Sequence, residues 1–210
     1  QAVGYGKAAM VFHMARREVG DAAFWGGLRT VARERMFRPT SWDDIARDLG
    51  AASGRNLGPF FRQWLGKAGA PVLALSDVRV ARDGEGWKVT GRVTQREPRY
   101  ALKVPLRLET AGKSVAATVP LVRADAPFSI ASRDAPAALL LDPDVDLFRR
   151  LDPSEIPPTV NGIRGSSQLV VVLASGVPAE TAEASRILLA AMGRERLPLL
   201  REEEAPPETV

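Results

Sequence analysis

Cysteine is absent from the 210-residue sequence, and histidine occurs only once, at His13. Without cysteine the chain has no disulfides and no thiolate ligands for a metal. Zinc sites commonly draw at least three protein ligands from histidine, cysteine and carboxylates, so this sequence does not supply the usual set. We therefore predict a structural role for His13, packed within a helical layer, and no metal or cofactor site in the chain itself. The lack of cysteine leaves the cellular compartment open.

Long apolar runs and blocks of like charge are also missing. No stretch approaches the roughly 18 to 20 apolar residues of a membrane-spanning helix, so we predict no membrane span. The formal net charge is +4, but the arginines are scattered among carboxylates, which does not favour nucleic-acid binding. Residues 1–4 lack the basic and apolar regions of a signal peptide, and the sequence does not begin with methionine. We therefore interpret the chain as a piece of a longer protein.

Residues 1–70 have the spacing of short amphipathic helices. Apolar side chains recur at helical intervals from Lys7 to Val19, and Asp21 is a suitable N-cap for the next helix. Ser41 and Asp44 form a capping-box variant that opens a third helix. A fourth helix is expected to run through Trp64 and to end at Gly66. A basic cluster, which suits a helix C-terminus, closes the second helix: Arg33, Arg35 and Arg38.

Residues 71–150 change to the alternation of half-buried strands. The turn Asp83–Gly86 separates two such runs and predicts a hairpin. A later run, Leu102–Leu108, contains Pro105, and a proline inside a strand pattern favours an edge strand. Several strands at near-regular spacing predict an antiparallel β-sandwich. The sequence at 142–144, Asp-Pro-Asp, resembles a metal-binding loop at first sight. We interpret it as a turn, because no further acidic residues follow at calcium-loop spacing.

Residues 151–210 begin with a linker by composition, extended by the glycine and serine residues at 161–167. The apolar run 169–173 is typical of a buried parallel strand. A helix is expected from Ala179 to Met192, ended by Gly193, with one apolar stripe made of Ala184, Ile187, Leu188 and Ala191. This is half of a βαβ unit. It lacks a glycine-rich phosphate-binding motif, so a nucleotide-binding module is the weakest interpretation. The strand needs a partner, from the rest of a longer protein or from a second copy of the chain.

The predicted fold class is therefore α+β and multidomain. It consists of a helical part at 1–70, an antiparallel β-sandwich at 71–150, and a linker with a small α/β extension at 151–210. Because four short helices do not obviously make a self-sufficient layer, we also expect self-association through this layer or through the strand of the extension.

Three segments in the first third of the chain carry a resemblance to a known family. They are Tyr5-Gly6-Lys7-Ala8-Ala9, Phe60-Phe61-Arg62-Gln63-Trp64 and Gly69-Ala70-Pro71. Their order resembles the end of the thermolysin-like catalytic domain in the zinc aminopeptidases of the gluzincin clan, which include aminopeptidase N and leukotriene A4 hydrolase-like proteins. In that family a tyrosine precedes a lysine at the start of a helix, a Phe-Phe-x-Gln-Trp helix follows, and Gly-x-Pro leads into a β-sandwich that serves as a structural spacer.

The resemblance implies a catalytic role for Tyr5. In the family, the equivalent tyrosine donates a hydrogen bond to the oxyanion that forms when zinc-bound water attacks the scissile carbonyl. A phenol suits this task because it is a neutral hydrogen-bond donor at the site of developing charge. On spacing alone, Tyr5 is simply an aromatic residue that flanks a helix. The family's His-Glu-x-x-His zinc motif and its distal glutamate lie upstream of this tyrosine and do not occur in the sequence.

The resemblance implies a zinc-dependent metallopeptidase that removes N-terminal residues from peptide substrates, of which this chain is a C-terminal fragment. The fragment is expected to bind no catalytic zinc and to be inactive by itself. The alternative is a non-catalytic scaffold or protein-interaction module derived from the same family. The presence or absence of the upstream zinc motif discriminates between these hypotheses.

Overall fold

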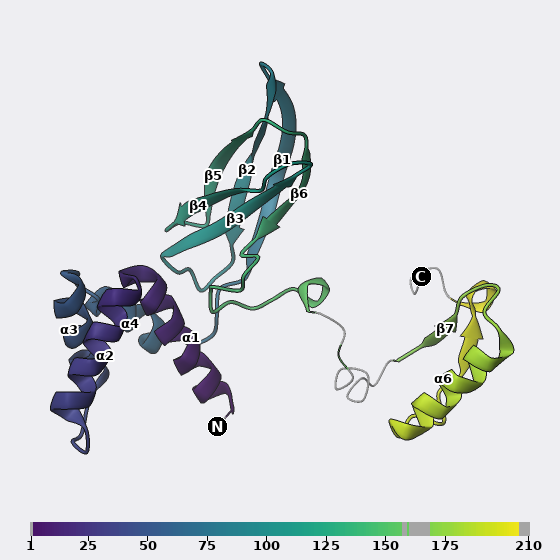
Figure 1. Ribbon diagram of the computed structural model, residues 1–210, viewed down its shortest axis with the longest axis horizontal. Coiled ribbons are helices and arrows are strands. Elements are labelled where there is room, and N and C mark those ends of the chain that lie inside the picture. The colour runs from purple at the N-terminus through teal and green to yellow at the C-terminus, as the bar shows by residue number, and fades with distance from the viewer. Residues whose placement is uncertain (1, 157–158, 160–168, 206–210) are drawn as a thin grey trace. The chain divides into compact units, whose positions relative to one another are not determined.

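The computed structural model describes residues 2–156, 159 and 169–205. It divides into two compact units, Gln1–Leu151 and Asp152–Val210, which are described separately (Figure 1). The chain has an α+β fold, as the sequence predicts, with five α-helices among the described residues. The first unit contains four of these helices and two antiparallel sheets, and the second contains the remaining helix and a two-stranded sheet.

Four helices form the N-terminal part of the first unit: α1 (Ala2–Val19), α2 (Asp21–Arg35), α3 (Trp42–Ser53) and α4 (Gly58–Gly66). The predicted capping box is present at the start of α3, where the Ser41 hydroxyl accepts the Asp44 N–H and the Asp44 carboxylate accepts the Ser41 N–H. The prediction that Asp21 caps α2 is wrong, because Gly20 occupies the N-cap position. The Asp21 carboxylate is instead engaged by Arg16, whose Nε and Nη2 atoms lie 2.8 and 2.7 Å from its oxygens.

The helices pack through large apolar side chains and one close backbone approach. Gly27 of α2 lies against α3, where an added Cβ would meet Leu49 Cδ2 at 2.7 Å and Leu49 Cα at 2.9 Å. Any larger residue would force the two helices apart, so this glycine permits their contact. The large apolar side chains buried in the helical layer are those of Val11, Met14, Phe24, Leu49, Leu57, Phe61 and Trp64.

Six strands follow α4: β1 (Leu73–Asp83), β2 (Gly86–Gln95), β3 (Leu102–Thr110), β4 (Val115–Leu121), β5 (Asp125–Ser132) and β6 (Pro136–Leu141). They form two three-stranded sheets with the orders β1-β2-β5 and β4-β3-β6, and all pairings are antiparallel. The predicted hairpin is present, with Asp83 opposite Gly86. Inward-facing residues of both sheets join one apolar core, among them Val89, Val93, Val104, Leu106, Leu121 and Ile130.

The prediction that Pro105 marks an edge strand is wrong, because β3 is the central strand of its sheet. The pairing of β3 with β6 begins only at Leu106, opposite Leu141. The carbonyl of Pro105 accepts a hydrogen bond from the Asp142 N–H at 2.8 Å, so the backbone of Pro105 is directed to the side where β6 has just ended. The missing N–H of the proline therefore falls at the end of that ladder, where it interrupts no run of hydrogen bonds.

The second unit contains η1 (Pro153–Glu155), β7 (Val171–Leu173), α6 (Ala179–Ala191), β8 (Leu199–Arg201) and η2 (Glu202–Glu204). Strands β7 and β8 are parallel, with Val171 opposite Leu199, so β7, α6 and β8 form a βαβ arrangement. The sequence predicts only the first half of this arrangement. The partner strand of β7, expected from the rest of a longer protein or from a second copy, is β8 of the chain itself, which ends at Arg201. Self-association stays a prediction.

The apolar stripe of α6 differs from the predicted one. Ile187 and Leu188 were expected to face inward but are exposed, whereas Leu189 is buried. Three consecutive large aliphatic residues allow more than one stripe, and Leu189 is the buried one of the three. The predicted linker lies mostly outside the described residues, which include neither 157–158 nor 160–168. Of the helices in the described ranges, none has the length and apolar character needed to span a membrane.

Candidate functional site

Tyr5 lies in the N-terminal part of α1, and its side chain is 80% exposed. The residue is therefore within the helix, which begins at Ala2 and not at Lys7 as the spacing suggested. The side chain of Lys7, two residues further on, contacts two later parts of the chain. Its Nζ donates to the carbonyl of Lys67 at 3.1 Å and lies 5.7 Å from the ring centroid of Phe148. The two residues of the family segment thus differ in environment, since Lys7 anchors the helix and Tyr5 is open to a ligand.

The middle of α1 is tied to the loop that follows β6. His13 Nε2 lies 2.7 Å from Asp146 Oδ1, and Arg17 Nη2 lies 3.0 Å from Asp146 Oδ2. Between them, Met14 is buried, and its sulfur lies 3.4 Å from the backbone nitrogen of Phe148. His13 therefore contacts the loop after β6, whereas the sequence predicted that it packs within the helical layer. One carboxylate receives two side chains that lie one turn apart on α1.

The same loop contains a buried ion pair. The Asp142 side chain is fully buried and the Arg149 side chain is 2% exposed, with 2.9 Å between Arg149 Nε and Asp142 Oδ2. The carboxylate of Asp142 also accepts the Asp146 N–H at 2.8 Å. Burial raises the pKa of Asp142, and the hydrogen bond and charge of Arg149 act against this rise. Asp142 thereby fixes the backbone at Asp146.

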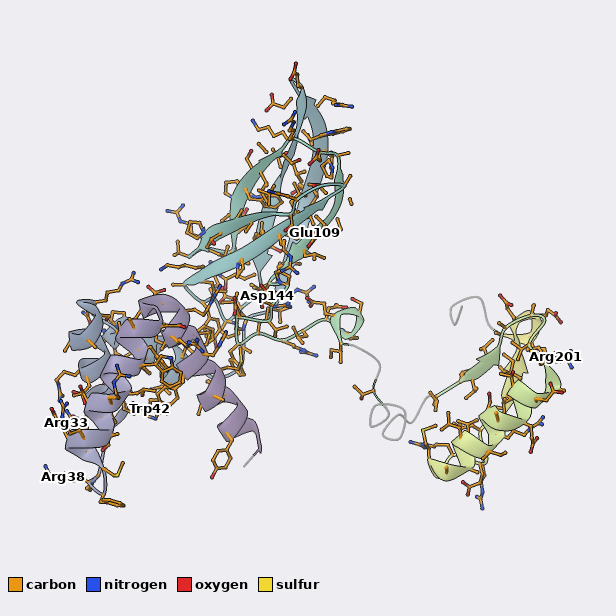
Figure 2. The ribbon with its side chains drawn as sticks, in the orientation of Figure 1. Arg33, Arg38, Trp42, Glu109, Asp144 and Arg201 are labelled. Carbon is orange, nitrogen blue, oxygen red and sulfur yellow. The ribbon has the colours of Figure 1, made fainter. Side chains whose placement is uncertain are left out.

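The Asp-Pro-Asp sequence at 142–144 is a turn and not a metal loop. The carboxylate of Asp142 is paired with Arg149, and its backbone has a positive φ of 48°. Asp144 Oδ1 accepts from Arg107 Nη1 at 3.1 Å, and Arg107 Nε donates to Glu109 at 2.8 Å. Figure 2 labels Glu109 and Asp144, the two carboxylates that share this arginine. Each carboxylate of the turn is thus paired with an arginine of the same unit.

Helix α4 joins the sandwich through the side chain of Gln63. Its Nε2 donates to the Ala101 carbonyl at 3.1 Å and its Oε1 accepts the Ala101 N–H at 2.7 Å. The next residue, Trp64, is buried and stacks on Tyr100 with 4.9 Å between ring centroids. The Tyr100 hydroxyl donates to the carbonyls of Ala68 and Gly69, each at 3.2 Å. The Gln-Trp pair of the family segment therefore joins the helical part to the start of β3.

A cleft of about 810 Å³ lies beside this joint. Its apolar lining includes Met14, Leu57, Phe60, Trp64, Leu102 and Leu147. Its polar lining includes Glu18, whose carboxylate oxygens lie 2.8 and 2.9 Å from Lys103 Nζ and whose Oε1 lies 2.9 Å from Arg55 Nη2. Tyr5 does not line this cleft. The cleft is therefore a feature of the joint and not the surroundings of the predicted catalytic residue.

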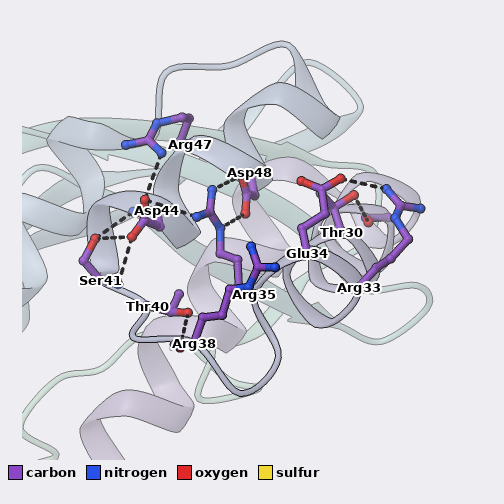
Figure 3. Close-up of polar contacts among 11 residues, drawn as sticks. Thr30, Arg33, Glu34, Arg35, Arg38, Thr40, Ser41, Asp44, Arg47 and Asp48 are labelled. Atoms are coloured by element: carbon purple, nitrogen blue, oxygen red, sulfur yellow. Dashed lines mark hydrogen bonds and ion pairs between the residues drawn. The ribbon is translucent and has the colours of Figure 1, made fainter.

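The predicted basic cluster at the end of α2 is divided by the structure (Figure 3). Arg35 turns inward, where its Nε and Nη2 atoms lie 2.6 and 3.1 Å from the carboxylate oxygens of Asp48. This pairing lowers the pKa of Asp48. Arg33 instead pairs with its neighbour Glu34 at 3.1 Å, and Arg38 lies beyond the helix end. The cluster thus stabilises the corner between α2 and α3, and it does not form a continuous basic surface.

The described residues do not fit a catalytic zinc ion. Within residues 2–156, 159 and 169–205, no group of three histidine, cysteine, aspartate or glutamate side chains could hold a metal. His13 is engaged by Asp146. Zinc ligands for the implied chemistry would have to come from outside the described part of the chain.

Curated relatives of the chain carry aminopeptidase names. The chain is 34% identical over 73 residues to aminopeptidase N of Lactococcus lactis subsp. lactis, which covers 35% of the chain and 9% of the relative. It is 25% identical over 115 residues to leucyl aminopeptidase of Saccharolobus solfataricus, covering 54% of the chain and 14% of the relative. A probable M1 family aminopeptidase of Encephalitozoon cuniculi is 28% identical over 75 residues, covering 36% of the chain and 9% of the relative. The curated relatives that the chain matches are M1 aminopeptidases.

A solved structure shares the fold of the chain. The crystal structure of Legionella pneumophila aminopeptidase A in complex with aspartic acid superposes with a TM-score of 0.58 at 14% sequence identity, covering 78% of the chain and 19% of that protein. At this identity the likeness concerns the fold. No family model matches the chain. The chain spans between 9 and 14% of the length of the curated M1 aminopeptidases that it matches.

The sequence predicts a role for Tyr5, which stays a prediction, and singles out Gln63, whose contacts the structure shows. It gave no prediction for Asp146 or for the pairing of Asp142 with Arg149. The partners of Asp146 lie 129 and 133 residues earlier in the chain, so no local pattern relates them. The available signal was three aspartates, at positions 142, 144 and 146, in the otherwise apolar segment 139–148.

Proposed function

We propose that this chain forms the end of a thermolysin-like catalytic domain, and the sandwich that follows it, in a zinc-dependent aminopeptidase. The full-length protein would hydrolyse the N-terminal peptide bond of peptide substrates. The observation that carries the proposal is the sequence similarity to M1 aminopeptidases, together with the exposed Tyr5 at the start of the M1-like segments. The β-sandwich fold after Pro71 also supports it.

Tyr5 is the residue of this chain that we propose for catalysis. Its phenol would donate a hydrogen bond to the oxygen that becomes negatively charged when water adds to the scissile carbonyl. Such a donor accelerates hydrolysis because its bond strengthens as the charge develops. The exposure of Tyr5 and the anchoring of Lys7 beside it are consistent with a hydroxyl presented to a substrate from a fixed helix.

Zinc belongs to the proposal for the full-length protein alone. The described residues offer no set of metal ligands, so we propose that this chain by itself binds no catalytic zinc and does not turn over peptides. Peptide substrates are likewise proposed for the full-length protein. The chain's own contribution is the phenol of Tyr5 and the framework that holds its helix.

The test is zinc content and aminopeptidase activity of the full-length protein, with Tyr5→Phe beside the wild type. We expect about one zinc per chain, and in the Phe variant a kcat that is lower by about 10²- to 10³-fold with zinc content unchanged. Amino-acid amides of a fluorogenic amine serve as substrates. Absence of both zinc and turnover in the wild type would contradict the proposal and favour a non-catalytic scaffold or interaction module of the same ancestry.

A further inference from the structure

Two of the contacts that hold α1 to the sandwich are made by one side chain, Asp146. Each of its two carboxylate oxygens receives a different residue of the helix, His13 at 2.7 Å and Arg17 at 3.0 Å. The Asp146 side chain is 12% exposed, whereas those of His13 and Arg17 are 38% and 63% exposed, so the carboxylate is the shielded partner in both contacts. A carboxylate gripped at two points one helical turn apart restricts both the rotation of α1 about its axis and its sliding along that axis.

Asp146 is itself held from the other side. Its backbone N–H donates to Asp142 at 2.8 Å, and Asp142 is fixed by the buried Arg149. Further along, Arg150 forms an isolated parallel β-bridge with Val72, which directly precedes β1. The carboxylate that receives α1 is therefore placed by the sandwich core and not by a free loop.

Tyr5 lies eight residues before His13 on the same helix, which corresponds to about 12 Å along the helix axis. We propose that Asp146 is a positioning residue, which fixes through His13 and Arg17 where α1 presents the Tyr5 hydroxyl. This inference rests on the proposed function of Tyr5. It gives the sandwich a part in catalysis, in contrast to the role of spacer that the family resemblance implies.

The expected cost of losing this restraint follows from how hydrolysis depends on geometry. A donor that stabilises an oxyanion must lie within hydrogen-bonding distance of it, and a displacement of about 1 Å can lower the rate by about 10²-fold. Without Asp146, α1 keeps its contacts through Lys7 and Glu18, so we expect a smaller displacement and a loss of about tenfold.

The experiment is a double-mutant cycle in the full-length protein with Asp146→Ala, Tyr5→Phe and the combination. We expect Asp146→Ala to lower kcat about tenfold with KM nearly unchanged, and to lower it less than about twofold when Phe already replaces Tyr5. The matched control is Asp21→Asn, which removes the other aspartate that pairs with an arginine of α1 but leaves Asp146 in place. This control should retain wild-type kcat.

Equal losses from Asp146→Ala in both backgrounds would overturn the inference, because a merely structural effect does not depend on the Tyr5 hydroxyl. Unchanged kcat would overturn it as well. Both results leave the proposed function intact if Tyr5→Phe alone lowers kcat. If the wild type does not turn over, the proposed function fails. The positioning of α1 is then judged by hydrogen exchange in the 210-residue chain, where Asp146→Ala, but not Asp21→Asn, should speed exchange across residues 7–17.

Discussion

Two inward-facing aspartate–arginine pairs, one in the helical layer and one in the sandwich, respond to their surroundings in opposite ways. Asp48 pairs with Arg35 at the α2–α3 corner, and the pKa of Asp48 is lowered. Asp142 pairs with Arg149 in the loop after β6, and the pKa of Asp142 is raised. The N···O distances are similar, at 2.6 and 2.9 Å, so the quality of the pairing does not explain the difference.

Water explains it. The Arg35 side chain is 24% exposed, so the corner keeps partial hydration and the attraction of the arginine dominates for Asp48. Asp142 has no exposed surface, and the loss of hydration is the largest influence on its pKa even though Arg149 and two backbone N–H groups oppose it. An ion pair thus stabilises the charged carboxylate at the corner, whereas in the sandwich it compensates for burial.

The largest expected effect comes from removing the arginine of the buried pair. Arg149→Met leaves the Asp142 carboxylate buried without its cation, and we expect a loss of about 3 to 5 kcal/mol in the free energy of unfolding. Urea denaturation of the chain measures it. The combination with Asp142→Asn should recover part of the loss, because no uncompensated charge remains. A loss below about 1 kcal/mol for Arg149→Met would contradict the comparison.

The pair at the corner should matter less. Asp48→Asn keeps the size of the side chain and removes its charge, and we expect a loss of about 1 kcal/mol because Arg35 can turn to water. The same denaturation experiment applies, with Asp43→Asn, an exposed neighbour on α3, as the control that changes stability by less than about 0.5 kcal/mol. A loss as large as that of Arg149→Met would show that hydration does not separate the two pairs.

The two pairs should also give opposite pH dependences. Because the folded pKa of Asp48 is lowered, its carboxylate contributes fully to the free energy of unfolding above the unfolded pKa of about 3.9. This contribution is lost as the pH falls from there through the folded pKa. Because the folded pKa of Asp142 is raised, its side chain contributes fully to the free energy of unfolding below about pH 3.9. This contribution is lost as the pH rises through the folded pKa. Unfolding free energies of Asp48→Asn and Asp142→Asn, measured from pH 3 to 7 against wild type, should differ from it with opposite slopes. Parallel slopes would refute the assignment.

The smallest expected effect is that of Tyr5→Phe on stability. The Tyr5 side chain is 80% exposed, so removal of its hydroxyl should change the unfolding free energy by less than about 0.5 kcal/mol. Thermal unfolding of the 210-residue chain measures this baseline. A larger loss would mean that the phenol has a structural partner, and the kinetic effect of the same substitution could then no longer be assigned to catalysis.

Local patterns predicted local structure well in this chain. The Ser41–Asp44 capping box, the hairpin turn at Asp83–Gly86 and the end of α6 before Gly193 all depend on residues within a few positions of one another. The family resemblance was confirmed by the aminopeptidase relatives. Each of the three segments that carry it is contiguous in the sequence and can be recognised without knowledge of the fold.

Apart from the N-cap predicted at Asp21, the errors concern choices that neighbours in space decide. Pro105 lies in a central strand, at the point where β6 ends beside it, and Leu189 rather than Ile187 is the buried residue of α6. The contacts of Asp146 with His13 and Arg17 exist because the fold brings α1 against the loop after β6, far along the chain. Periodicity identifies apolar faces, but it contains no information about which face is covered or which distant carboxylate receives a cation.

The tie between His13 and Asp146 has a consequence for the order of events during synthesis. The two residues are 133 positions apart. At about 5 to 20 residues per second, a ribosome needs roughly 7 to 27 s to add that length of chain. The first helix of this sequence therefore exists for that interval without the carboxylate that later secures it. An assay of nascent chains should find α1 sensitive to protease until the loop after β6 has emerged.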